Sequence, residues 1–178
     1  TLVVVVLADA LFRWPDFRAT ERSYQILRQV SGRAGRGEKP GKVLIQTFDP
    51  ENPVISAIQG SLSEEKLLSD EKELRRALQY PPFGRMARLR FESVDQIEAR
   101  NRAGEVASRL IAGANDGEMT VLGPSEAFLE KAKGIYRWDI LLKSREIGPL
   151  QKAILVAKDV CASRKWPFSV DVDPYGVG

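Results

Sequence analysis

The sequence predicts two parts in series: an incomplete α/β unit of parallel strand, helix and strand, and then an α+β domain. One observation is a run of β-branched apolar residues near the start, followed by a helical pattern and a second apolar strand. The other is a change, after two consecutive prolines, to alternating strands separated by two amphipathic helices. A length of 178 residues suits one ordinary domain or two small ones.

The N-terminal part follows the pattern of one crossover unit. Residues 2–7 predict a strand buried on both faces, as in a parallel sheet. Residues 19–30 carry apolar side chains at helical spacing up to a glycine-rich segment that begins at Gly32, and residues 42–48 predict a second strand. About 50 residues of this kind cannot cover two sheet faces alone. We therefore expect this part to need a partner that the chain does not contain.

Two helices should follow, a short one over 52–58 and a longer one over 63–80. Pro81 and Pro82 end the second helix, because proline lacks the amide hydrogen that continues a helix. These features predict a first domain over 1–60, a connecting helix over 61–80 and a second domain over 81–178.

The second domain should have a βαββαβ order. Strand 85–92 alternates strictly, which places Ala87, Leu89 and Phe91 on one face and the arginines between them on the other. Further strands are predicted over 119–122, 135–143 and 168–172, and amphipathic helices over 95–114 and 150–161. Two helices on one face of a four-stranded antiparallel sheet form the ferredoxin-like, or split βαβ, arrangement.

The composition is typical of a globular protein and argues against several classes of enzyme and membrane protein. Hydrophobic residues make up 43% and charged residues 29%, as in ordinary globular domains. No apolar run approaches the roughly 20 residues that cross a bilayer, so we expect no membrane segment. The chain has no histidine and one cysteine, Cys161, which excludes a multi-cysteine zinc site and the commonest general base. A self-contained hydrolase or metalloenzyme is not expected, and the cysteine usage fits an intracellular protein.

The net charge of +3 is unevenly distributed. Segment 18–42 holds seven basic residues against two acids, 75–91 holds five arginines and no acid, and 131–145 holds five basic residues against one acid. Clustered positive charge indicates polyanion binding, although a solvated face gives the same pattern.

The segment with the clearest chemistry lies at the end of the first long helix, and its residues are Gln29, Gly32, Arg33, Gly35 and Arg36. Two arginines three residues apart offer a pair of guanidinium forks, which suits a triphosphate. Glycine beside them allows close approach to the backbone. The same residues also fit a helix C-terminus, where glycine ends the helix and arginine complements the dipole. The residues alone leave both interpretations open.

Residues 29–37 resemble motif VI of superfamily 2 helicases. Asp9 and the segments 15–22 and 41–47 are similar, more narrowly, to the PriA family of primosomal replication-restart helicases. The second half agrees independently, in residues 80–85, 136–138 and 171–174. The resemblance covers nearly the whole chain, with the motifs in the order of the family.

The resemblance implies that residues 1–60 end the second RecA-like lobe of a cytoplasmic, ATP-dependent 3′–5′ DNA helicase, and that the second domain contributes to DNA binding. Arg33 and Arg36 would reach the γ-phosphate of ATP, Arg36 as an arginine finger, with Gln29, Gly32 and Gly35 at the same cleft. Asp9 falls near motif V, which couples the nucleotide to the DNA strand. The implied partners are forked or single-stranded DNA, single-stranded DNA-binding protein and primosome proteins.

The departures from the family pattern limit the activity that we expect of this chain alone. It has no G-x-x-x-x-G-K-[ST] loop and no Asp-Glu box, so ATP and Mg²⁺ would be held by an earlier lobe, and zinc by a cysteine-rich insertion that is also absent. We therefore predict a C-terminal fragment that neither hydrolyses ATP nor unwinds DNA alone. The alternatives are a non-catalytic nucleic-acid or protein-binding module and another superfamily 2 helicase, such as a RecG-like one.

Six residues are candidate DNA contacts in the second domain: Arg85, Arg88, Arg90, Lys131, Lys133 and Arg137. A basic sheet face with aromatic side chains nearby can follow a phosphate backbone and stack bases. The alternative is that Arg88 and Arg90 lie opposite Asp171 and Asp173 on the last strand, in cross-strand pairs that only stabilise the sheet.

Trp14 and Phe17 lie in a loop beside the helicase-like motifs. These side chains either pack between domains or contact DNA, and we favour packing.

Overall fold

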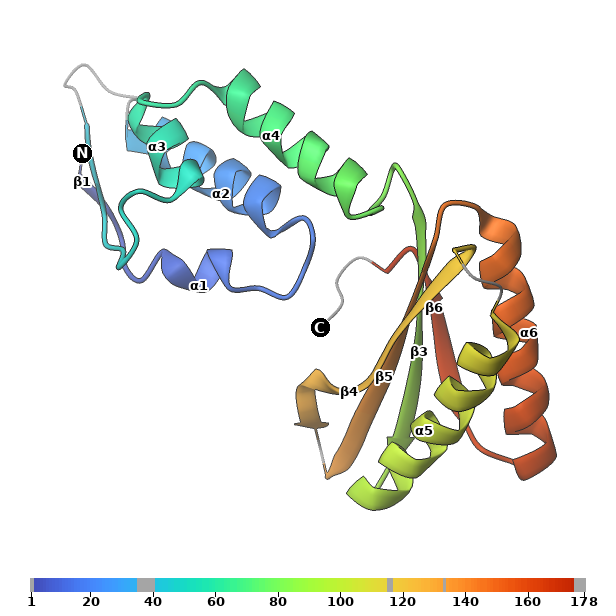
Figure 1. Ribbon diagram of the computed structural model, residues 1–178. Coiled ribbons are helices and arrows are strands. Elements are labelled where there is room, and N and C mark those ends of the chain that lie inside the picture. Colours follow the sequence, from blue (N-terminus) through green and yellow to red (C-terminus); the bar gives the residue numbers. More distant parts are fainter. Residues whose placement is uncertain (1, 35–40, 115–116, 133, 175–178) are drawn as a thin grey trace. The chain divides into compact units, whose positions relative to one another are not determined.

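The computed structural model describes residues 2–34, 41–114, 117–132 and 134–174 (Figure 1). The chain divides into two compact units, Thr1–Leu74 and Arg75–Gly178, which are described separately below.

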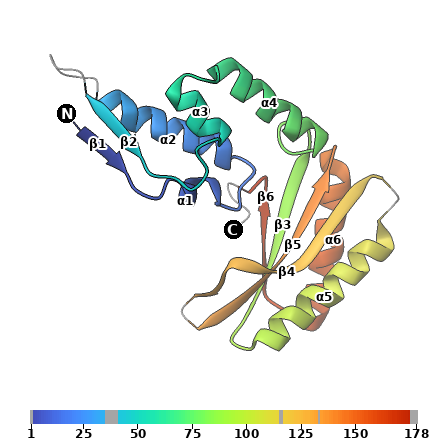
Figure 2. The same cartoon turned by 60° about the vertical axis from the view of Figure 1, so that its left-hand side comes forward.

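The first unit is built on a parallel pair of strands. Its elements in chain order are β1 (Leu2–Val5), α1 (Asp9–Phe12), α2 (Ala19–Ala34), β2 (Lys42–Ile45), α3 (Pro53–Gln59) and α4 (Glu64–Ala77), the last of which continues into the second unit. The parallel register, from Leu2 with Lys42 to Val5 with Ile45, confirms the predicted strand–helix–strand crossover. Figure 2 shows β1 and β2 side by side with α2 along them. The short helix α1 was not predicted.

The core of this unit lies between the strands and the helices. Its buried members are Ala8, Tyr24, Leu27, Val54, Ile55 and Leu67. The expectation that the first strand is buried on both faces is wrong: Leu2, Val4 and Leu44 are 61%, 53% and 56% exposed. Within the described residues the helices cover only one face of this two-stranded sheet, which agrees with the expected need for a partner.

Helix α2 extends further than its apolar spacing predicts. It passes through Gly32 and ends at Ala34, so Gly32 does not terminate it. A Cβ added at Gly32 would meet no atom within 4 Å, so packing does not require glycine there. Gly41 differs, because a Cβ there would lie 1.8 Å from the Ala34 carbonyl oxygen. Glycine at this position lets the start of β2 approach the end of α2.

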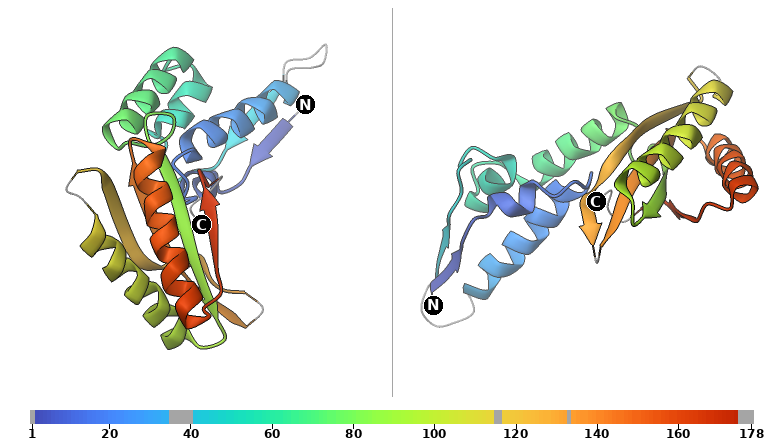
Figure 3. Two further views of the ribbon diagram at one scale, coloured as in Figure 1. Left: turned by 90° about the vertical axis from the view of Figure 1, so that its right-hand side faces the viewer. Right: turned by 90° about the horizontal axis from the view of Figure 1, so that it is seen from below.

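The second unit is the predicted α+β domain. Its elements are β3 (Arg85–Ser93), α5 (Gln96–Gly113), β4 (Met119–Ala132), β5 (Ile135–Ser144), α6 (Ile147–Arg164) and β6 (Phe168–Val172). The sheet order is β4-β5-β3-β6 and every neighbouring pair is antiparallel. Helices α5 and α6 both pack on one face of this sheet (Figure 3). The βαββαβ arrangement is thereby confirmed.

The core of the second unit lies between that sheet face and the two helices. The alternation predicted for β3 is confirmed, since Ala87, Leu89 and Phe91 are fully buried. The Phe91 and Phe168 rings stack with centroids 5.7 Å apart. Two apolar residues at the ends of their elements lie outside this core: Ile111, near the end of α5, is 58% exposed, and Val172, at the end of edge strand β6, is 45% exposed.

Strand β4 is longer than predicted. The predicted strand ends at Leu122, but beyond Gly123 and Pro124 the pairing with β5 resumes at Ser125 after a register shift. Since β4 is an edge strand, it tolerates a proline that donates no ladder hydrogen bond at this irregularity.

Candidate functional site

The predicted triphosphate-contacting residues lie at the end of α2. Gln29 and Arg33, four residues apart, share one side of the helix and are both exposed. Among the described residues, the Arg33 guanidinium makes no hydrogen bond or ion pair, and the neighbouring Gly32 is open to solvent. Gly35 and Arg36 lie outside the described residues. The arrangement leaves one guanidinium and an accessible backbone available to an anionic ligand.

Gln29 also lines a groove of about 440 Å³ between α2 and α4. The carboxylates of Glu21 and Glu64 line the same groove. Arg28 pairs with Glu64, and this hydrogen bond and charge raise the pKa of Arg28. A triphosphate would be repelled by two carboxylates, so the groove itself is a poor phosphate site. The end of α2 at Arg33 is the better one.

Asp9 is engaged within the first unit. Its carboxylate accepts hydrogen bonds from the Thr47 hydroxyl at 3.1 Å and from the Phe48 amide at 3.1 and 3.2 Å. Burial by itself raises the pKa of Asp9, but these hydrogen bonds outweigh it and the net pKa is lowered. Asp9 therefore joins the start of α1 to the segment after β2.

The loop between α1 and α2 is organised by Asp16. Its buried carboxylate accepts hydrogen bonds from the Arg18 amide at 2.9 Å and from Arg22 Nη1 at 3.2 Å. Trp14 in the same loop is 49% exposed. It lines a groove of about 260 Å³ between α1 and α2 together with Leu11 and Ile26.

The sheet arginines of the second unit are matched to carboxylates. Four of the six candidate DNA contacts form ion pairs, at N–O distances of 2.6–2.9 Å: Arg85 with Asp173, Arg88 with Asp171, Arg90 with Asp139, and Arg137 with Glu92. Three of these pairs are direct cross-strand neighbours in the sheet: Arg88 with Asp171, Arg90 with Asp139, and Arg137 with Glu92. The pairing alternative is therefore confirmed for Arg88.

The predicted partner of Arg90 is wrong. Because β3 and β6 run antiparallel, a step from Arg88 to Arg90 is a step from Asp171 back to Ser169. Asp173 consequently binds Arg85, and Arg90 binds Asp139 on β5 through two hydrogen bonds of 2.8 and 2.7 Å. The hydrogen bond from Arg90 to Asp139 raises the pKa of Arg90. Sequence spacing identified these arginines and the partner of Arg88, but it carries no signal for the register that sets the partners of Arg85 and Arg90.

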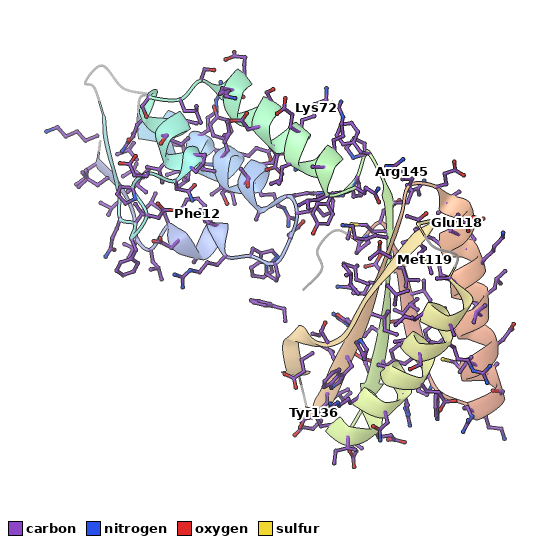
Figure 4. The ribbon with its side chains drawn as sticks, in the orientation of Figure 1. Phe12, Lys72, Glu118, Met119, Tyr136 and Arg145 are labelled. Carbon is purple, nitrogen blue, oxygen red and sulfur yellow. The ribbon has the colours of Figure 1, made fainter. Side chains whose placement is uncertain are left out.

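The remaining two candidates belong to the β4–β5 hairpin. The Lys131 backbone pairs with Tyr136 near the end of β4, and Lys133 lies outside the described residues. Figure 4 shows Tyr136 at the hairpin end of the sheet, with Glu118, Met119 and Arg145 at the other end. The backbone position of Lys131, opposite Tyr136, is thus at the other end of β5 from Ser144, which pairs with Arg85.

The part of the chain that the structure describes has neither a cluster of metal-binding side chains nor a membrane-spanning helix. No group of three or more His, Cys, Asp or Glu side chains there could hold a metal ion. In the same residues, no helix is both long and apolar enough to cross a membrane.

Comparison with known proteins finds relatives that match nearly the whole chain. The family model described as "Primosomal protein N C-terminal domain" matches residues 76–175. Replication restart protein PriA of Synechocystis sp. is 36% identical over 99% of this chain and 21% of its own length. The PriA proteins of Bacillus subtilis (34%; 98% and 22%) and Treponema pallidum (36%; 99% and 27%) are similar to it as well. The chain spans about a fifth to a quarter of these relatives.

Proposed function

Because the chain belongs to the family of the primosomal protein N C-terminal domain, we propose that it is the C-terminal part of an ATP-dependent replication-restart DNA helicase. In this proposal β1, α2 and β2 end a RecA-like lobe, and the end of α2 contributes to an ATP site whose other half lies earlier in the protein. ATP and Mg²⁺ supply the phosphoryl chemistry, and the residues of this chain stabilise the charge that develops on the γ-phosphate.

One observation carries this proposal: the unmatched guanidinium of Arg33. The sheet arginines from Arg85 to Arg90 each have a carboxylate partner, whereas Arg33 is exposed and without a partner among the described residues. Gly32 beside it has no packing reason to be glycine. An unmatched arginine next to open backbone fits a ligand that arrives from outside the unit.

The helix-terminus interpretation gives Arg33 a different role. An arginine in the last turn of α2 complements the helix dipole whether or not a nucleotide binds. Arg164, exposed in the last turn of α6, meets the same condition away from the motif. It therefore serves as a matched control.

The test is steady-state ATP hydrolysis by the complete protein that carries this chain. Arg36→Ala is expected to lower kcat by about 10³- to 10⁵-fold, as for other arginine fingers, and Arg33→Ala to lower it in the same direction. Arg164→Ala should leave kcat unchanged. Wild-type turnover by folded Arg33→Ala and Arg36→Ala variants would refute the proposal.

The isolated 178-residue chain provides a second readout. It should not hydrolyse ATP with or without DNA, because it lacks a phosphate-binding loop. Robust DNA-stimulated turnover by this chain alone would contradict its assignment as the second half of a split site.

For DNA contact by the second unit, we propose the β4–β5 hairpin rather than the paired arginines. Guanidinium groups bound to Asp171 and Asp139 would have to give up those partners to reach a phosphate. Reversing the charge at Lys131 and Lys133 to glutamate should weaken binding of single-stranded DNA and reduce its salt dependence. Unchanged affinity and an unchanged salt slope would remove the hairpin from the DNA site.

A further inference from the structure

The groove between α1 and α2 has an apolar lining and an aromatic wall. Its volume is about 260 Å³, and Trp14, Leu11 and Ile26 lie along it. The Trp14 and Ile26 side chains are 49% and 44% exposed, so they present apolar surface to solvent. The Ser23 hydroxyl, which also lines the groove, donates to the Ala19 carbonyl at 2.6 Å and offers no unpaired donor. The groove therefore suits one flat apolar ring system rather than a polar group.

The carboxylates near this groove are buried or hydrogen-bonded, whereas positive charge near it is exposed to solvent. Its nearby carboxylates point inward: the Asp16 side chain is fully buried, and Asp9 is occupied by Thr47 and Phe48. Of the nearby arginines, Arg13 is exposed and points outward, whereas the Arg22 side chain at the rim is 47% exposed and pairs with Asp16 at 3.2 Å. Glu21 lines the groove on the other side of α2. The solvent-facing charge beside the Trp14 groove is thus cationic.

We propose that this groove binds a base of single-stranded DNA. The base stacks on the Trp14 indole, and a flanking phosphate lies against Arg13. An apolar slot beside an exposed arginine matches the two parts of a nucleotide, a flat base and an anionic phosphate. This inference rests on the proposed function, because it takes DNA to be the polyanion that the protein binds.

The experiment combines a protein change with a ligand change. The 178-residue chain and its Trp14→Ala variant are titrated with a labelled oligothymidylate and with a strand of equal length whose sugars carry no bases. Loss of one stacking contact should weaken oligothymidylate binding by about 5- to 150-fold and leave abasic-strand binding within about twofold. Trp14→Phe, which keeps an aromatic face, should retain most of the affinity.

Phe48→Ala is the matched control. Phe48 is an aromatic residue of the same unit, 81% exposed, and it is not among the residues that line the groove. Its removal should leave oligothymidylate affinity unchanged. Arg13→Ala should weaken binding of both strands equally and lower the salt slope, because it removes a phosphate contact rather than a base contact.

The outcomes separate this inference from the proposed function. If the wild-type chain binds oligothymidylate but Trp14→Ala loses nothing, or loses affinity equally for both strands, the stacking site is refuted while the proposed function stands. If the wild-type chain binds neither strand, DNA contact by this chain fails, and the stacking site fails with it. Circular dichroism checks that each variant is folded, and if Trp14→Ala is not, Trp14→Leu must show the same selective loss.

Discussion

The Arg90–Asp139 pair offers the sharpest test of how the second unit is held together. Two hydrogen bonds of 2.8 and 2.7 Å join the side chains, of which only 18% and 9% are exposed. Arg90→Met keeps the apolar stem but leaves the Asp139 carboxylate buried without its cation. Removing one partner of a buried pair costs about 3–5 kcal/mol, since the remaining charge stays desolvated. We expect the free energy of unfolding to fall by this amount.

The matched control is Arg137→Met on β5. Arg137 also binds a cross-strand carboxylate at 2.8 Å, but that partner, Glu92, is 45% exposed. Water can solvate Glu92 once the arginine is gone, so the expected loss is about 0–1 kcal/mol. The difference between the two variants therefore measures the effect of burying the carboxylate, since both variants break one ion pair.

The measurement is urea unfolding of the chain, with amide hydrogen exchange in β3 and β5 to assign the change to the second unit. A loss of about 3–5 kcal/mol corresponds to an unfolding equilibrium raised by about 10²- to 10⁴-fold. The double variant Arg90→Met with Asp139→Leu should recover most of the loss, because no unpaired charge remains. If Arg90→Met costs no more than Arg137→Met, the argument from desolvation is refuted.

Three further outcomes follow from the same structure. Gly32→Ala should stabilise the first unit by about 0.5–1 kcal/mol, since the added methyl meets open space in a helix. Gly32→Ala should still slow ATP turnover of the complete protein. The control is Gly104→Ala in α5, where an added methyl also meets open space, and it should stabilise the chain without slowing turnover. Urea midpoints measure the stability of each variant, and kcat measures its turnover. Gly41→Ala should lower the urea midpoint, at a cost of about 1–3 kcal/mol, because its methyl would overlap the carbonyl at the end of α2. The hydrogen bond from the Ser93 hydroxyl lowers the pKa of Glu98 below 4.5, so its stabilisation should be lost as the pH falls through that lowered value. Glu98→Gln should flatten the acid limb of the stability curve, and an unaltered acid limb would contradict this.

Much of the architecture was available from local patterns. The period-2 alternation of 85–92 identified the buried face of β3, and the amphipathic pattern over 150–161 predicted α6, which buries Leu150, Ile154, Ala157 and Cys161. These patterns repeat over a few residues, so they need no knowledge of distant partners. The limits of the helices were not set by local patterns alone. Helix α2 continues through Gly32, because glycine in a helix costs only about 1 kcal/mol and tertiary contacts override it.

What the sequence determined by itself is the order of the strands and long helices, the inward face of β3, and the identity of the basic residues. The tertiary structure decided which carboxylate each arginine binds, because that depends on the direction and register of two strands far apart in the chain. Arg90 shows the difference: its own strand fixed its face, but antiparallel pairing sent Asp173 to Arg85 and brought Asp139 to Arg90. Strand pairing also gives each of these sheet arginines a carboxylate partner, whereas Arg33 has no partner among the described residues.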